Sequence, residues 1–250
     1  MGPSAAQELA EAASNGSSAN GIVVKPQLTL TGKVIAVTGG NRGIGLGVAE
    51  CCLINDAAKV YSIDLAEPGD EFAAILKRFP GRIAALQANV TDEDSIAAAV
   101  DRIVEESGAI HGIVVNAGRT NHKAALDFTK KEIEDLFNVN LFGSFYTARV
   151  AAKAFIKLGI KGSVVFTASM ASDRPNKIVP STPYGASKAG VRNMTHTLAM
   201  GGQKLGGAYV YLLSDAASYT TSIDIPVNGV IGVSRNPVFG RYKMLTQLAT

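Results

Sequence analysis

Cysteine is almost absent from this chain, which has only two in 250 residues, the adjacent Cys51 and Cys52. Two neighbouring cysteines cannot build a disulfide framework, so a reducing compartment, most simply the cytoplasm, is expected. Both fall in a stretch with a helical pattern, where buried, inert thiols are the expected state. No apolar run approaches the roughly 18 residues of a membrane span. The N-terminal segment also lacks the pattern of a secretory or mitochondrial leader.

Positive and negative side chains are nearly balanced in this sequence. The sequence has 24 Lys and Arg residues against 21 Asp and Glu residues, a net charge of only +3. So small a surplus indicates neither a nucleic-acid nor a membrane-surface partner. His111, His122 and His196 have no metal-ligand spacing, so no metal site is expected and surface or cap positions are favoured. Hydrophobic residues make up 47% of the sequence, as in a globular protein with a full core.

What the sequence does contain is a regular alternation of short apolar runs and longer helical patterns. The expected strands are Val34–Thr38, Lys59–Ile63, Ile83–Gln87, Gly112–Val115 and Ser163–Thr167. The expected helices are Ile44–Asn55, Asp70–Phe79, Asp92–Ser107 and Thr129–Leu158. Strands that are apolar throughout indicate a parallel sheet buried on both faces. The alternation therefore predicts a doubly wound, Rossmann-like α/β fold with right-handed crossovers.

One domain is expected, over residues 28–233. Residues 1–27, rich in Ala, Ser, Gly and Asn, are expected to form a mobile tail, and residues 234–250 an atypical C-terminal tail. Thr91 and Asp94 resemble a capping box at the start of the third expected helix.

A glycine-rich stretch joins the first expected strand to the first helix: Thr38-Gly39-Gly40-Asn41-Arg42-Gly43-Ile44-Gly45. Glycines let the backbone approach a pyrophosphate, and a helix N-terminus offers free N–H groups. Asp64 follows 19 residues after Gly45, where a carboxylate would bind the adenosine ribose hydroxyls. Asp64 favours NAD because it repels a 2′-phosphate, whereas Arg42 could pair with that phosphate and leaves NADP open. On spacing alone, a strand–helix turn without a ligand explains the glycines equally well.

Three later motifs complete the pattern: Asn116-Ala117-Gly118, Asn138-Val139-Asn140, and Ser169 with Tyr184-Gly-Ala-Ser-Lys188. Together with the glycine loop they resemble the short-chain dehydrogenase/reductase family, in its compact branch, over about residues 28–229. The loop after Ser169, which carries several prolines, is similar to that of fungal-type sugar and polyol reductases, the subgroup of mannitol dehydrogenases and xylulose reductases.

Tyr184 and Lys188 are four residues apart and share one face of a helix. An ammonium beside a phenol lowers the phenol's pKa from about 10, so such a tyrosine can exchange a proton near neutral pH. By itself the pair is more often a surface feature. The glycine loop and Ser169 make the catalytic interpretation the stronger one.

The resemblance implies hydride transfer between NAD(H) or NADP(H) and a small ketone or secondary alcohol. It implies that Tyr184 is the acid/base, and that Ser169 orients the substrate oxygen. Lys188 would also hold the nicotinamide ribose, and Asn140 would fix a water that links Lys188 to solvent. The implied cofactor-binding residues are Gly39, Asn41, Arg42, Gly43, Ile44, Gly45, Asp64, Asn89, Val90, Asn116, Ala117, Gly118, Tyr184 and Lys188. A homodimer or homotetramer is expected through the helix over Thr129–Leu158 and the Tyr184 helix.

One part of the family pattern is missing after Lys188. The helix leads at once into Gly201-Gly202-Gln203-Lys204-Leu205, before a last helix expected over Gly207–Ser214 and a last strand over Ser222–Val227. No sixth strand, Pro-Gly turn or substrate lid fits between them, so the sheet is expected to lack its sixth strand. Two alternatives to an active reductase therefore stay open: a non-catalytic dinucleotide-binding protein, and an inactive or unstable truncated form. A hydrolase triad is not indicated, because Ser169 has no His or Asp partner in motif context.

Overall fold

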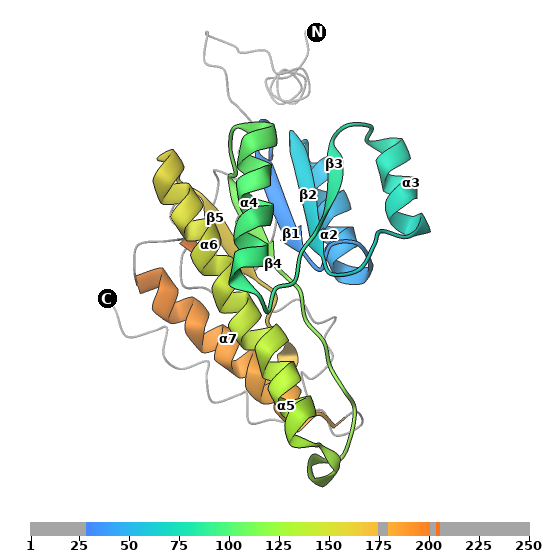
Figure 1. Cartoon of the computed structure of the whole chain (residues 1–250), viewed down its shortest axis with the longest axis vertical. Coiled ribbons are helices and arrows are strands. Elements are labelled where there is room, and N and C mark those ends of the chain that lie inside the picture. The colour runs from blue at the N-terminus through green and yellow to red at the C-terminus, as the bar shows by residue number, and fades with distance from the viewer. Residues whose placement is uncertain (1–28, 175–179, 201–203, 206–250) are drawn as a thin grey trace, which may run out of the picture.

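The computed structural model describes residues 29–174, 180–200 and 204–205. Its strands are β1 (Val34–Thr38), β2 (Lys59–Asp64), β3 (Ile83–Gln87), β4 (Gly112–Val115), β5 (Ser163–Phe166) and β6 (Lys204–Leu205). Its α-helices are α2 (Gly43–Ile54), α3 (Asp70–Arg78), α4 (Glu93–Ser107), α5 (Lys130–Phe137), α6 (Gly143–Leu158) and α7 (Thr182–Met200). Figure 1 shows the strands side by side in one sheet, with α5 and α6 following one another as one long column.

The strand order is β3-β2-β1-β4-β5-β6, and all neighbouring strands are parallel. β1 lies inside the sheet with every residue buried, because α2 and α3 cover one face while α4, α6 and α7 pack on the other. The chain order reverses between β1 and β4, and such a switch point opens a crevice at the carboxyl ends of the two strands. The predicted doubly wound, Rossmann-like fold is confirmed, and the glycine loop, Asp64 and Asn116 lie at the carboxyl ends of β1, β2 and β4.

Most predicted elements have nearly the predicted bounds, but the long helix does not run unbroken. A π-helical turn over Asn138–Phe142 separates α5 from α6. Turns of this kind are rare and concentrate at functional sites, and this one carries Asn140. The sequence pattern gave no sign of it, since the apolar positions continue on both sides.

The cap of α4 differs from the prediction. Asp92, not Thr91, is the N-cap, and its carboxylate accepts hydrogen bonds from the backbone N–H groups of Asp94 and Ser95. The Thr91 hydroxyl donates instead to Asn89 Oδ1, at 2.9 Å. The carboxylate one residue later reaches the exposed N–H groups of the first turn and replaces the predicted capping box.

The prediction that the sheet lacks a sixth strand is corrected in part, because a strand of two residues occupies that place. Lys204 and Leu205 form β6, which pairs in parallel with Ser163 and Val164 of β5. β6 has only two residues, which pair with β5 as the backbone passes its edge. Each of the other described strands has at least four residues. The expected last helix, last strand and both expected tails lie outside the described residues, as does the place of a lid.

The two cysteines do not share one environment. Cys52 is fully buried, and desolvation raises the pKa of its thiol to about 12, so it is inert as predicted. Cys51 is exposed, which corrects the expectation for that residue, because adjacent helical positions point about 100° apart. His111 caps no helix: it is half-buried just before β4, and its Nδ1 accepts from the backbone N–H of Val34, the first residue of β1, at 3.0 Å.

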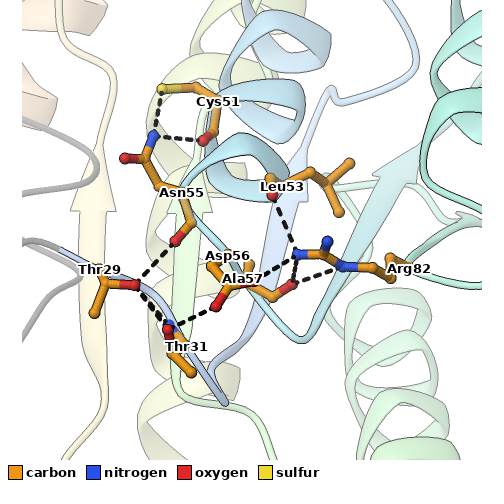
Figure 2. A network of polar contacts seen from close by, with 8 residues as sticks. All are labelled: Thr29, Thr31, Cys51, Leu53, Asn55, Asp56, Ala57 and Arg82. Atoms are coloured by element: carbon orange, nitrogen blue, oxygen red, sulfur yellow. Dashed lines mark hydrogen bonds and ion pairs between the residues drawn. The ribbon is translucent and has the colours of Figure 1, made fainter. Parts of the chain in front are cut away.

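A polar network ties the end of α2 to the chain before β3 (Figure 2). Arg82 donates to the carbonyl of Ala57 from Nε and Nη2, at 3.2 and 2.7 Å, and to the carbonyl of Leu53 at 3.1 Å. It also forms an ion pair with Asp56, a non-glycine residue with a left-handed φ of 69°. On the other side, the Thr31 hydroxyl donates to Asp56 Oδ2 at 2.8 Å. The guanidinium thus adds a charged donor to the Leu53 carbonyl, which also accepts from the Asp56 N–H at 3.1 Å, and binds the Ala57 carbonyl just beyond the helix.

Replacing Arg82 with alanine is expected to lower the free energy of unfolding by about 1.5–3 kcal/mol, because half-buried carbonyls lose a charged donor. The matched control is Arg102→Ala, which removes an exposed ion pair with Glu106 on α4 and should cost less than about 0.5 kcal/mol. Urea unfolding of both variants measures the difference. Equal effects would show that the Arg82 network does not stabilise the fold.

Candidate cofactor and catalytic site

The glycine loop lies at the carboxyl end of β1, against the loop that follows β4. Gly39 has a φ of 64°, and a Cβ there would lie 2.9 Å from Ala117 Cα. A Cβ on Gly45 would lie 2.0 Å from the Gly39 carbonyl oxygen and 2.7 Å from Asn116 Nδ2. Only glycine allows this close approach of two turns. The structure therefore brings Gly39, Gly45, Asn116 and Ala117 together, as the motifs predicted.

Thr38 holds the two loops together. Its hydroxyl accepts from the backbone N–H groups of Asn116 and Ala117, at 3.0 and 3.1 Å, and donates to the Val114 carbonyl at 3.3 Å. The Asn116 side chain returns a bond from Nδ2 to the Thr38 carbonyl, at 3.0 Å. The ends of β1 and β4 are thus joined by side chains beyond the last ladder bond.

The start of α2 is suited to a bound anion. Its N-cap residue, Arg42, makes no side-chain cap bond, and the first turn holds no acidic residue. Gly43 has a φ of 56°, with no atom within 4 Å of a built Cβ, and Ile44 is 70% exposed. Backbone N–H groups without partners and a positive helix end are what a pyrophosphate requires. The residues present fit a dinucleotide.

Asp64 stands at the end of β2, beside this loop. Its Oδ2 accepts from the backbone N–H of Asn41, and its Oδ1 from that of Ala66, both at 3.1 Å. Arg42 is exposed and forms no ion pair within the described parts of the chain. The carboxylate at the end of β2 and the guanidinium at the start of α2 therefore form no ion pair with one another.

Asn89 and Val90 follow β3. Asn89 Oδ1 accepts from the backbone N–H and the hydroxyl of Thr91, at 3.0 and 2.9 Å. Val90 contacts the π-helical region, because a Cβ on Gly143 would lie 2.9 Å from Val90 Cγ2. The segment predicted for the adenine side is thus held directly against the turn that carries Asn140.

Lys188 and Asn140 meet over Gly118. A Cβ built on Gly118 would lie 3.2 Å from Asn140 Oδ1 and 3.4 Å from Lys188 Nζ. Lys188 is buried and donates from Nζ to the Thr167 carbonyl at 2.7 Å. Desolvation lowers the pKa of its ammonium from 10.5 to about 8, because the interior disfavours the charged form.

Both polar atoms of the Asn140 side chain bind neighbouring residues. Its Oδ1 accepts from the Arg119 N–H at 2.9 Å. Its Nδ2 donates to the Arg119 carbonyl at 2.9 Å and to Ser187 Oγ at 3.0 Å. Ser187 in turn donates to the Tyr184 carbonyl. Asn140 therefore connects the loop after β4 to the helix of Tyr184.

Tyr184 lies half-buried one turn before Lys188 on α7. Ser169 begins the short turn after β5, and its hydroxyl accepts from the Ala171 N–H at 3.1 Å. α7 packs on this turn, since a Cβ on Gly185 would lie 3.0 Å from the Ala171 carbonyl oxygen. Within the described residues, no hydrogen bond joins the Ser169 and Tyr184 hydroxyls.

Sequence reasoning assigned no role to four hydroxyl residues that shape the site. They are Thr38, Ser62, Thr167 and Ser187. Ser62 left the clearest signal, a lone polar residue inside an otherwise apolar strand. For the other three, nothing in the motifs shows which groups they bind: the Thr38 hydroxyl binds backbone groups, the Thr167 hydroxyl donates to Asn116 Oδ1 at 3.3 Å, and Ser187 binds both the Asn140 side chain and the Tyr184 carbonyl.

Two searches of the described chain gave negative results. No cluster of three or more His, Cys, Asp or Glu side chains there could hold a metal ion. None of the described helices is both long enough and apolar enough to cross a bilayer.

Comparison with known proteins agrees with this architecture. A family model for short chain dehydrogenases matches residues 33–228. The chain therefore belongs to the short-chain dehydrogenase/reductase family of NAD(P)-dependent oxidoreductases. A short-chain type dehydrogenase/reductase from Mycobacterium marinum superposes with a TM-score of 0.76 at 26% identity, covering 82% of this chain and 97% of the other.

Two relatives illustrate the similarity. The chain is 29% identical to an NADP-dependent mannitol dehydrogenase of Hypocrea jecorina over 247 positions, covering 80% of this chain and 92% of that protein. It is 36% identical to a 2-dehydro-3-deoxy-D-gluconate 5-dehydrogenase of Escherichia coli over 174 positions, covering 68% of this chain and 66% of that enzyme.

The mannitol dehydrogenase match also reveals an internal gap. Its 247 positions take in only 80% of 250 residues, about 200, so about 47 positions have no counterpart in this chain. The match to the E. coli enzyme has 174 positions for 68% of the chain, about 170 residues, so only about 4 of its positions have no counterpart in this chain. This difference supports the prediction that an internal segment is missing.

Proposed function

We propose that this chain interconverts a ketone and a secondary alcohol by hydride transfer, with Tyr184 as the acid/base. The observation that carries the proposal is the buried Lys188, one turn from Tyr184 and facing Asn140 over Gly118. The open N-terminus of α2 supplies the second requirement, a place for the dinucleotide. A polyol, a sugar or a secondary metabolite is the proposed substrate, in keeping with the names of the relatives.

The reaction follows from these side chains. The bound nicotinamide supplies or accepts the hydride. In the reducing direction, the carbonyl carbon would gain a C–H bond from the hydride, the carbonyl oxygen would keep the electron pair of the opened C=O bond and take the Tyr184 proton, and the Ser169 hydroxyl would orient that oxygen. The Lys188 ammonium stabilises the phenolate that remains. The Asn140 link holds α7 and the loop after β4 in place while the proton is replaced.

For the cofactor we propose a preference for NAD over NADP. A 2′-hydroxyl can donate to the Asp64 carboxylate, whereas a 2′-phosphate would be repelled by it. Arg42 favours the opposite choice, as does the NADP dependence in the name of the mannitol dehydrogenase. We give Asp64 the larger weight because two backbone N–H groups fix its position.

The cytoplasm is the proposed compartment, as the two free thiols suggest. The proposed assembly is a homodimer or homotetramer. Exposed apolar side chains support the assembly: Phe142 is 46% exposed, and Ile156 on α6 is 73% exposed. Contact between copies would remove them from water.

A second candidate is a non-catalytic dinucleotide-binding protein, or an inactive shortened form of such a reductase. The internal gap of about 47 positions favours it, because a site without its lid admits water. Both candidates predict cofactor binding, and only the first predicts turnover.

Tyr184→Phe distinguishes the two candidates. The variant should bind NADH and NADPH as the wild type does, while turnover falls by about 100-fold or more, since general acid–base catalysis contributes that much. Fluorescence titration measures binding, and nicotinamide absorbance with a panel of ketoses and polyols measures turnover. Turnover that survives in the variant contradicts the role of Tyr184. Wild-type binding without any turnover establishes the second candidate.

A further inference from the structure

The side chains of Asn41, Ser62 and Asp64, together called the clamp below, fasten the glycine loop to β2. Ser62 is fully buried on β2, and its hydroxyl donates to Asn41 Oδ1 at 2.6 Å. Asn41 Nδ2 donates to the Ala66 carbonyl at 2.6 Å, and the Asn41 N–H donates to Asp64. Asn41 thus binds residues 62, 64 and 66, alternate positions along the end of β2 and its exit.

These bonds leave Asn41 poorly placed to contact a cofactor. Its backbone N–H and both polar ends of its side chain already have partners within the protein, and the residue is 5% exposed. The loop is pressed closely onto β2, because a Cβ on Gly40 would lie 2.6 Å from Ser62 Oγ. Ser62 itself has no exposed surface.

The clamp decides where the Asp64 carboxylate stands. One oxygen accepts from Asn41 and the other from Ala66, and Asn41 binds Ala66 as well. A carboxylate offers about four acceptor positions, so two remain for a ligand. Their direction is set by backbone N–H groups that the clamp holds still.

We propose that Asn41 and Ser62 are positioning residues for cofactor preference, which they set by aiming Asp64 at the adenosine ribose. This inference rests on the proposed function, in which Asp64 selects a free 2′-hydroxyl. Asn41 then acts through Asp64, without binding the pyrophosphate or the ribose. Loss of the clamp frees the carboxylate to turn away, so the protein tolerates a 2′-phosphate better.

The test is the ratio of the Kd for NADPH to the Kd for NADH, measured by fluorescence titration of the full chain. In the wild type NADH should bind more tightly. Ser62→Ala should lower the ratio about fivefold, mainly by weakening NADH, which corresponds to about 1 kcal/mol, the net contribution of one hydrogen bond. The ratio, unlike the affinity for either cofactor, does not change when a substitution merely loosens the fold.

Tyr61→Phe is the matched control. Tyr61 precedes Ser62 on the same strand and is as deeply buried, but its hydroxyl bonds to Glu106 and Ser107 on α4. The substitution removes a hydroxyl from β2 without touching the clamp, so the ratio should stay at the wild-type value.

Asn41→Ala tests the clamp from the loop side. It should lower the ratio as Ser62→Ala does, and the double variant should behave like either single one, because the two residues act as a unit. If Ser62→Ala does not fold, Asn41→Ala decides. An unchanged ratio in the folded variants, or a wild type that prefers NADPH, overturns the inference. A wild type that binds neither cofactor instead refutes the proposed function.

Discussion

Replacing Gly45 with alanine is expected to weaken NADH binding by about 5- to 150-fold and to lower the free energy of unfolding. The added Cβ would lie 2.0 Å from the Gly39 carbonyl oxygen and 2.8 Å from the Gly39 carbonyl carbon. These are backbone atoms in a turn that Asn116 and Ala117 also confine, so the loop must open to admit the methyl group. Overpacking of this kind costs about 1–3 kcal/mol, which gives the stated range of affinity.

Gly47 provides the control for Gly45. It lies two residues further along α2, and a Cβ there meets no atom within 4 Å. Gly47→Ala should leave NADH binding unchanged and raise the free energy of unfolding by about 0.5–1 kcal/mol, because alanine favours a helix. Thermal unfolding with and without NADH measures both effects. If the two alanines behave alike, the close approach of Gly45 to Gly39 does not shape the nucleotide loop.

Replacing Lys188 with methionine is expected to stabilise the cofactor-free protein while abolishing turnover. Burial lowers the pKa of Lys188 from 10.5 to about 8, so keeping the ammonium at pH 7 costs roughly 3 kcal/mol. Methionine fills a similar volume without charge. It forfeits the hydrogen bond to the Thr167 carbonyl, which offsets about 1 kcal/mol. The expected net gain in the free energy of unfolding is about 2 kcal/mol.

The stability difference between wild type and Lys188→Met is expected to depend on pH. Between pH 8 and 10.5 the unfolded chain retains the Lys188 proton that the folded protein has lost, so wild-type stability rises with pH across this window. The advantage of Lys188→Met is therefore complete below pH 8 and declines towards pH 10.5. Urea unfolding at pH 7, 9 and 10 follows it. Lys157→Met, at an exposed position on α6, should show no such trend. A variant less stable than wild type at pH 7 would contradict the cost assigned to the buried ammonium.

The sheet could be predicted from the sequence because its strands are apolar throughout and short turns separate them from helices. β1, β3 and β4 have the predicted bounds. β1 and β4 are buried throughout, and β3 is buried at Ile83 and Leu86, so each contains an apolar run. The glycine loop could be predicted for a similar reason. Close backbone approach permits only glycine, and this leaves a visible spacing in the sequence.

The remaining features depend on residues that meet only in the folded chain. The π-helical turn at Asn140 has no local signal, and the bonds of the Asn140 side chain reach Arg119 and Ser187, which lie 21 and 47 positions away in the sequence. The bond between Ser62 and Asn41 joins residues 21 positions apart, and each residue alone has an ordinary explanation. β6 is only two residues long, too short to produce an apolar run.

The contacts around the glycine loop also bear on the order of events during synthesis. Thr38, Gly39 and Asn41 find their hydrogen-bond partners among residues 62–66 and 114–117, all of which leave the ribosome before Tyr184. Chains fold from the N-terminus as they emerge. The glycine loop can therefore form its contacts before α7, which carries Tyr184, has left the ribosome. The contacts that shape the glycine loop therefore do not depend on the part of the chain beyond the fifth strand.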